Sequence, residues 1–152
     1  MKLSLKRKSL RWLLVLVALS CSMPVAAIDL LELPAIKSDA ASRTLLLDVT
    51  RRGPSSLVAV GTYGVVIVSD DGGKTWVQSD VPASVTLTAV DFPTESKGWA
   101  VGHDGLIIHS DDGGATWRKQ LDGHQLNEQI IAVAERIIEQ VQAELDALQA
   151  AE

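Results

Sequence analysis

Hydrophobic and polar positions alternate in short segments from residue 44 to residue 119, and the pattern changes after residue 123. The first region holds short apolar or β-branched runs, separated by turns rich in glycine, proline, serine and aspartate. This pattern predicts strands, and Pro54 and Pro93 argue against helix there. We expect eight strands, at residues 44–49, 57–60, 65–69, 76–78, 85–92, 98–101, 106–110 and 117–119.

Beyond Gly123 the apolar positions follow a helical period. They recur seven residues apart and again three residues later, as in the a and d positions of a coiled coil: Ile131, Ala134, Ile138, Val141, Leu145 and Leu148. We expect an amphipathic helix at 127–150, capped by Asn127, within a terminal segment at 123–152. Its apolar stripe predicts packing on a second helix, either further along the same chain or in another copy.

The strand region contains an internal repeat. Residues 59–76 read AVGTYGVVIVSDDGGKTW and residues 100–117 read AVGHDGLIIHSDDGGATW, an ungapped match at an offset of 41 residues. A period near 41 is typical of a four-stranded propeller blade or of a helical repeat, and the strand pattern favours the blade. The fold class expected is therefore all-β, with two four-stranded antiparallel blades over 44–122, about 44–83 and 84–122, followed by the α-helix.

The same octapeptide, Ser-x-Asp-x-Gly-x-x-Trp, occurs in each repeat. Its defining positions are Ser69, Asp71, Gly73 and Trp76 in the first copy, and Ser110, Asp112, Gly114 and Trp117 in the second. A tight hairpin needs glycines that tolerate positive φ, and Asp and Ser side chains bond the backbone of such turns. The tryptophan is expected to fill space between blades, with its N–H on a polar partner. We expect structural roles, and no catalytic, metal or cofactor role; the acidic spacing is not that of a calcium-binding EF-hand loop.

Residues 1–27 have the form of a secretory signal. A basic start precedes a short apolar run, which is far below the roughly 20 residues needed to cross a bilayer. Small residues then precede Ile28, as at a signal cleavage site. We expect export to the periplasm or another extracytoplasmic space with cleavage after Ala27, leaving an N-terminal segment at 28–43. An uncleaved membrane anchor and a lipid-modified Cys21 are the alternatives.

The charge balance of the cleaved chain limits its partners. Five of the 14 basic residues lie in the leader and all 19 acidic residues lie outside it, so nine basic residues remain and the net charge becomes −10. This argues against nucleic acid and anionic lipid surfaces as partners, because both require basic patches. No cysteine remains, so packing alone must hold the fold.

The repeats resemble the Asp-box, or BNR, repeat of sialidase-like β-propellers, and most closely the photosystem II stability/assembly factor family. The resemblance rests on the two octapeptides, on the turns at 61–64 and 102–105, and on the segment at 92–102, and it covers about residues 44–118. It implies a non-catalytic propeller on the lumenal or periplasmic side that acts as an assembly scaffold. The expected partner is a protein, in a membrane-associated complex. Because two blades do not close a propeller, we expect either the N-terminal part of a longer one or an assembly of several copies.

A carbohydrate-binding or sialidase-like propeller is the alternative function. By resemblance, a sialidase uses three arginines, a Tyr nucleophile activated by a Glu, and an Asp acid/base, and the residues here match no such motif. Too few aromatic residues are available for a carbohydrate-binding cluster. Arg51 and Arg52, the basic doublet of the cleaved chain, are read either as a solvated loop tip or as a contact for an acidic partner.

Overall fold

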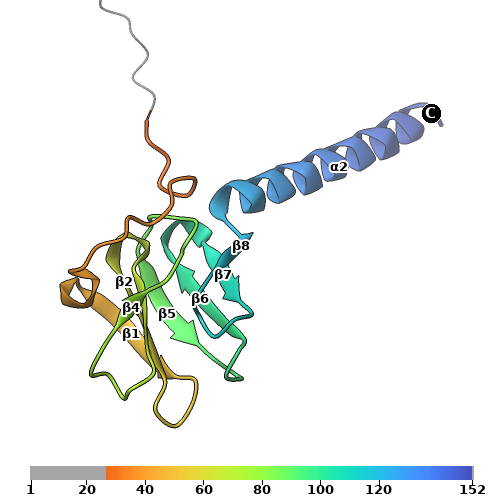
Figure 1. The fold of residues 1–152 in the computed structure, drawn as a ribbon. Helices are drawn as coiled ribbons and strands as arrows, with labels where there is room; N and C mark the ends of the chain where they lie inside the picture. Colours follow the sequence, from red (N-terminus) through yellow and green to blue (C-terminus); the bar gives the residue numbers. More distant parts are fainter. Residues whose placement is uncertain (1–26, 152) are drawn as a thin grey trace, which may run out of the picture.

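The structure is a computed structural model, and it describes residues 27–151; the expected leader lies outside the described residues, except for Ala27. The described chain forms two small sheets, which are followed by a long helix (Figure 1). The elements in order are η1 (Ala41–Arg43), β1 (Leu46–Arg51), β2 (Leu57–Gly61), η2 (Thr62–Gly64), β3 (Val66–Ser69), β4 (Val77–Gln78), β5 (Leu87–Asp91), β6 (Gly98–Gly102), η3 (His103–Gly105), β7 (Ile107–Ser110), β8 (Arg118–Leu121) and α2 (Gly123–Gln149).

Each sheet has four antiparallel strands in sequence order. Strands β1 to β4 form the first sheet, blade 1, and β5 to β8 form the second, blade 2. The register of β1 on β2 is repeated by β5 on β6, and both pairs have an irregularity at the same position. The predicted fold class, two antiparallel Asp-box blades with a C-terminal helix, is therefore confirmed.

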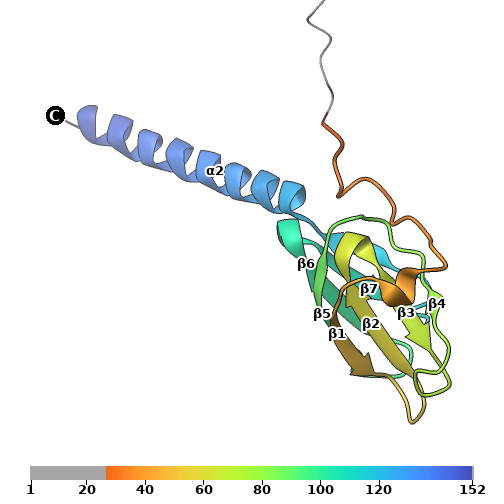
Figure 2. The ribbon, with the colours of Figure 1, turned by 90° about the vertical axis from the view of Figure 1, so that its left-hand side faces the viewer.

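The two blades pack face to face over a shared apolar core (Figures 1 and 2). One face of blade 1 contributes Val58, Val60 and Val66, each fully buried. Blade 2 covers this face mainly through β5, and Val90 and Phe92 belong to the same cluster. The facing apolar sides of the two sheets therefore form one continuous core instead of two separate cores.

The N-terminal segment packs along both blades before β1 begins. The N–H of Ala35 donates to the Val81 carbonyl (3.0 Å), and the N–H of Ser84 donates to the Leu30 carbonyl (2.8 Å). Ala41, in η1, is buried against Ile67 on the other face of blade 1. This segment therefore acts as a strap over the connection between the blades.

Helix α2 begins at Gly123, four residues before the predicted start at Asn127, and this boundary is corrected. Asp122 caps it, accepting a hydrogen bond from the Gln125 N–H (3.0 Å). The sequence prediction placed the cap at Asn127, whereas the carboxylate of Asp122 supplies it.

Helix α2 extends away from the blades, and it has no buried residue along its 27 positions (Figures 1 and 2). Its predicted apolar stripe is exposed, with Ile131, Ile138 and Leu148 each more than half accessible. Among the described residues, no helix is both long and apolar enough to cross a membrane. The packing of this stripe on a second helix stays a prediction.

Candidate functional site: the Asp boxes and the surfaces beside them

The first Asp box closes the hairpin between β3 and β4 with a ring of internal hydrogen bonds. The Ser69 hydroxyl donates to Asp71 Oδ1 (2.8 Å) and accepts from the Gly73 N–H (2.8 Å). Asp71 also accepts from the Thr75 N–H (2.9 Å) and the Thr75 hydroxyl (2.6 Å). The backbone N–H groups of the turn are thereby bonded without a partner strand, which is the structural role expected of these residue types.

The second box repeats this arrangement between β7 and β8. Ser110 donates to Asp112 Oδ1 (2.8 Å) and accepts from the Gly114 N–H (2.8 Å), and the Thr116 hydroxyl donates to Asp112 Oδ2 (2.6 Å). The match in geometry follows from the match in sequence, since every bond lies within eight residues.

Hydrogen bonding holds both box aspartates in their charged form. The Thr75 hydroxyl, the Thr75 N–H and the Ser69 hydroxyl lower the pKa of Asp71 from 3.8 to about 2. Burial raises the pKa of Asp112, but hydrogen bonds from Thr116 and Ser110 outweigh it and leave that pKa below its usual value. A carboxyl that is ionised at neutral pH does not supply a proton, so Asp71 and Asp112 are not suited to act as general acids.

The two box tryptophans share a hydrogen bond and differ in packing. Each indole N–H donates to the glycine carbonyl of its own turn, Trp76 to Gly73 (3.0 Å) and Trp117 to Gly114 (3.0 Å). Trp117 is buried between the blades and meets Phe92 edge to face, with ring centroids 5.8 Å apart. Trp76 lies on the outward face of blade 1, where it packs on the cluster around Ala41.

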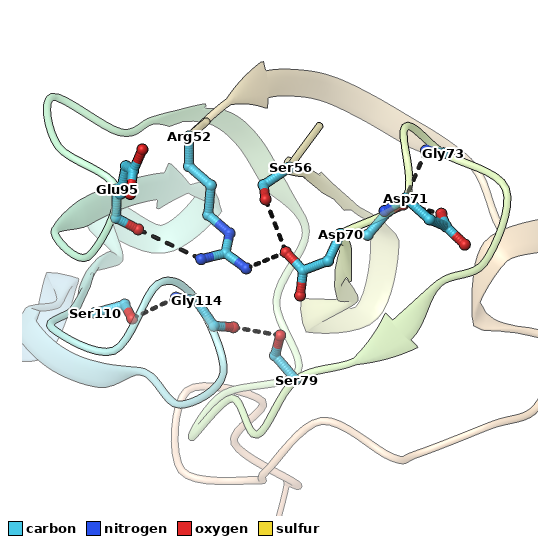
Figure 3. A network of polar contacts seen from close by, with 10 residues as sticks. Arg52, Ser56, Asp70, Asp71, Gly73, Ser79, Glu95, Ser110 and Gly114 are labelled. Atoms are coloured by element: carbon cyan, nitrogen blue, oxygen red, sulfur yellow. Dashed lines mark hydrogen bonds and ion pairs between the residues drawn. The ribbon is translucent and has the colours of Figure 1, made fainter. Parts of the chain in front are cut away.

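Arg52 joins the loops of the two blades (Figure 3). Its Nη2 lies 2.6 Å from Asp70 Oδ1, and its Nη1 donates to the Glu95 carbonyl (3.4 Å). Ser56 also donates to Asp70 (2.8 Å). Most of the guanidinium is thus occupied between blade 1 and blade 2.

Arg51, the other arginine of the predicted contact, is placed differently. It is exposed, and its Nη1 donates to the nearby Pro54 carbonyl (3.3 Å). Of the two arginines, Arg51 is the one whose side chain extends into solvent. The two arginines could not be separated from the sequence alone, because the difference depends on Glu95 and Asp70, which are distant in the chain.

An apolar groove of about 310 Å³ lies between the N-terminal segment and blade 1. Its lining is almost entirely carbon, and exposed side chains stand along it: Leu30, Leu33, Ile36 and Tyr63. Sequence reasoning did not find this groove, because residues 28–43 show no strand or helix period.

Tyr63 at the groove is held in a left-handed backbone conformation, with φ 57°. Such a conformation is unusual for a bulky residue and often marks a functional position. Asp104 occupies the matching position of blade 2 with φ 55°. The turn therefore imposes the left-handed conformation in both blades. In blade 1 the residue that adopts it, Tyr63, carries an exposed aromatic ring.

Metal binding finds no support in the acidic residues. Among residues 27–151, no three His, Cys, Asp or Glu side chains are grouped as a metal site. Both carboxylate oxygens of Asp71 accept hydrogen bonds, from Ser69 and from residues 74 and 75.

Comparison with known protein families also finds the two Asp-box repeats. The model of the BNR/Asp-box repeat family matches residues 67–78 and 108–119, so the predicted Asp boxes are confirmed. No curated protein matches the chain.

Two solved structures are similar to the blade region. YCF48 from Cyanidioschyzon merolae has 30% sequence identity and a TM-score of 0.45, covering 51% of this chain and 24% of that one. A structure of YCF48 bound to D1 peptide has 27% identity and a TM-score of 0.46, covering 51% and 26%. The chain thus spans about a quarter of the length of these structures.

Proposed function

We propose that this Asp-box chain is a non-catalytic scaffold, exported from the cytoplasm, that binds an apolar segment of a protein partner in a membrane-associated complex. The observation that carries the proposal is the groove beside Tyr63. It is open and apolar, and exposed Leu33 and Ile36 stand along it. An exposed apolar surface of this kind marks an interaction site more often than a catalytic one.

The Asp boxes support a binding role over a glycosidase role. A retaining or inverting glycosidase needs one carboxyl that is protonated at working pH. Asp71 and Asp112 have lowered pKa values and are bonded within their own turns. Their geometry supports a structural role, in which they close the hairpins of the two blades.

The similar structure of YCF48 bound to D1 peptide suggests the kind of partner. For that protein the ligand is a peptide; we extend the same class of ligand to this chain. An extended peptide with apolar side chains fits the groove, because the groove walls offer almost no polar group to orient a sugar.

The proposal is tested by fluorescence polarisation with a labelled D1 peptide and the purified chain. Tyr63→Asp installs the residue that blade 2 carries at the same turn position, so the backbone conformation is retained while the aromatic wall is lost. We expect peptide binding to weaken by on the order of tenfold or more, as for loss of an aromatic anchor.

Val77→Asp is the matched control. Val77 is as exposed as Tyr63, at 72%, but lies on β4 and does not line the groove. If Tyr63→Asp bound the peptide with unchanged affinity, the groove would be ruled out as the binding site. Absence of any binding by the unsubstituted chain would rule out a D1-like partner.

A further inference from the structure

The strap that forms one wall of the Tyr63 groove makes two ionic contacts with the junction of β8 and α2. Asp29 Oδ2 lies 2.7 Å from Nε2 of His124, in the first turn of α2. Glu32 Oε1 lies 2.5 Å from the Lys119 ammonium on β8. We call these two contacts the strap clasp.

The residues of the strap clasp alternate along the chain with residues of the groove. Leu30 and Leu33 line the groove, and each directly follows a clasp residue in the sequence. Asp29 instead lines a separate hollow beside the start of α2. Leu31, between them, is 5% exposed and belongs to the core shared by the blades. Because the clasp carboxylates and the groove leucines share one short backbone segment, a shift of the clasp moves the groove wall.

The contact between Asp29 and His124 is the half of the strap clasp that titrates near neutral pH. The hydrogen bond to Asp29, together with its negative charge, raises the pKa of His124 above the ordinary 6.5. The Leu31 N–H and then His124 lower the pKa of Asp29, so this carboxylate stays ionised. The ionic contact is therefore fully present below pH 6.5 and is lost as the pH rises through the raised pKa of His124.

The charged groups around the His124 imidazole come from each neighbouring element. The N-terminus of α2 disfavours a cation in its first turn, so the surrounding carboxylates are what favour the imidazolium. These groups are Asp29 and Glu32 on the strap, Asp122 at the helix cap, Asp104 of η3 and Lys119 of β8. Lys119 is paired with both Glu32 and Asp122, so its half of the clasp persists when His124 loses its proton.

We propose that protonation of His124 closes the strap clasp and holds the groove wall in place, so that the groove binds its apolar partner more tightly when His124 is charged. The inference rests on the proposed function of the groove and adds its regulation. The Asp29 and His124 side chains are about half exposed, at 42% and 59%. We therefore expect a graded effect, on the order of threefold in affinity.

Amide hydrogen exchange of Ser84 tests the strap clasp without any ligand. The Ser84 N–H donates to the carbonyl of Leu30, next to Asp29, and therefore reports on loosening of this part of the strap. His124→Lys keeps a cation at both test pH values, and His124→Gln imitates the neutral imidazole. Comparison of variants at one pH cancels the intrinsic exchange rate.

The unsubstituted chain should change from one variant's behaviour to the other's as the pH rises. At about pH 5.5, where His124 is charged, its Ser84 amide should exchange as slowly as in His124→Lys. At about pH 8.5 it should exchange as in His124→Gln, about threefold faster than in His124→Lys. Equal exchange in the two variants at both pH values would overturn the clasp.

Fluorescence polarisation with the labelled D1 peptide then tests the groove. Relative to His124→Lys at the same pH, the unsubstituted chain should bind equally well at about pH 5.5 and about threefold more weakly at about pH 8.5. His124→Gln should bind more weakly at both. His103→Gln is the matched control, because it removes an exposed histidine of η3 outside the clasp, and it should retain the unsubstituted pH profile.

The two measurements separate failure of the clasp from failure of the groove. If no variant binds the peptide at any pH, the proposed function fails, and the exchange of Ser84 still decides whether the clasp exists. If the peptide binds and the affinity ratio between the unsubstituted chain and His124→Lys is the same at both pH values, the groove stands as a binding site and its regulation by His124 is overturned.

Discussion

At the scale of single residues, the Asp box is determined by local chemistry. Asp71 and Asp112 lie in sheets that differ in packing, yet each accepts the same hydroxyl bond from the threonine four residues later, at 2.6 Å. The ring of bonds closes within the octapeptide, so tertiary contacts do not alter it. What packing changes is burial: Trp117 is enclosed between the blades, and Trp76 is only partly covered.

The pKa of Asp71 gives a prediction for acid stability. Its folded pKa of about 2 lies below the ordinary 3.8, so its contribution is fully present above pH 3.8 and is lost as pH falls towards 2. We expect Asp71→Asn to be less stable than the unsubstituted chain at pH 7. The difference should shrink between pH 4 and pH 2, as measured by urea unfolding.

Asp39→Asn is the control for this experiment, since it replaces an exposed aspartate outside the box. It should follow the unsubstituted chain at every pH. A gap between the Asp71 variant and the unsubstituted chain that stays constant down to pH 2 would show that the lost stability comes from shape and not from charge.

At the scale of elements, the start of α2 shows how a cap decides a boundary. Asp122 is 2% exposed, accepts from the Gln125 N–H, and lies 3.1 Å from the Lys119 ammonium. Lys119 also pairs with Glu32 of the N-terminal segment (2.5 Å). The cap is therefore fixed by β8 and by a residue far away in sequence, which accounts for a helix that begins before Asn127.

Removal of this cap should shift the helix start. We expect Asp122→Ala to destabilise the protein by about 1–2 kcal/mol, the usual cost of losing an N-cap. Amide hydrogen exchange should then show faster exchange at residues 123–126, with the helix beginning near the predicted Asn127. Asp146→Ala, near the other end of α2, is the control, and equal exchange in both variants would contradict a capping role for Asp122.

At the scale of the whole molecule, the described chain presents two apolar surfaces that lie on different elements, the Tyr63 groove and the apolar stripe of α2. No residue that lines the groove belongs to α2. A partner in the groove and a helix on the stripe would therefore not compete for the same residues.

Export is the remaining prediction at this scale. We expect the mature protein to begin at Ile28 and to be found outside the cytoplasm, as measured by N-terminal sequencing and mass after cell fractionation. Replacing the basic residues 2–11 with glutamine should retain the protein in the cytoplasm. A mass that includes a lipid on Cys21 would show the lipoprotein route instead.

Features that depend on near neighbours along the chain could be predicted from the sequence alone. The repeat of 41 residues, the eight strands, both Asp boxes and the apolar stripe of α2 could all be predicted, because turn chemistry and hydrophobic period act over a few residues. The individual strand boundaries shifted by up to two residues, as expected where hydrogen bonding to a partner strand ends an element.

Which surfaces are covered depends on contacts between segments that are far apart in the chain. The strap of residues 28–43 has no period to reveal it, and its place depends on Val81 and Ser84 of the connection between the blades. The same holds for Arg51 and Arg52, which are adjacent and alike in sequence: Arg52 is held by Asp70 and by the Glu95 carbonyl, whereas Arg51 remains in solvent. The physical reason is that burial and pairing depend on residues distant in the chain, whose approach no local pattern specifies.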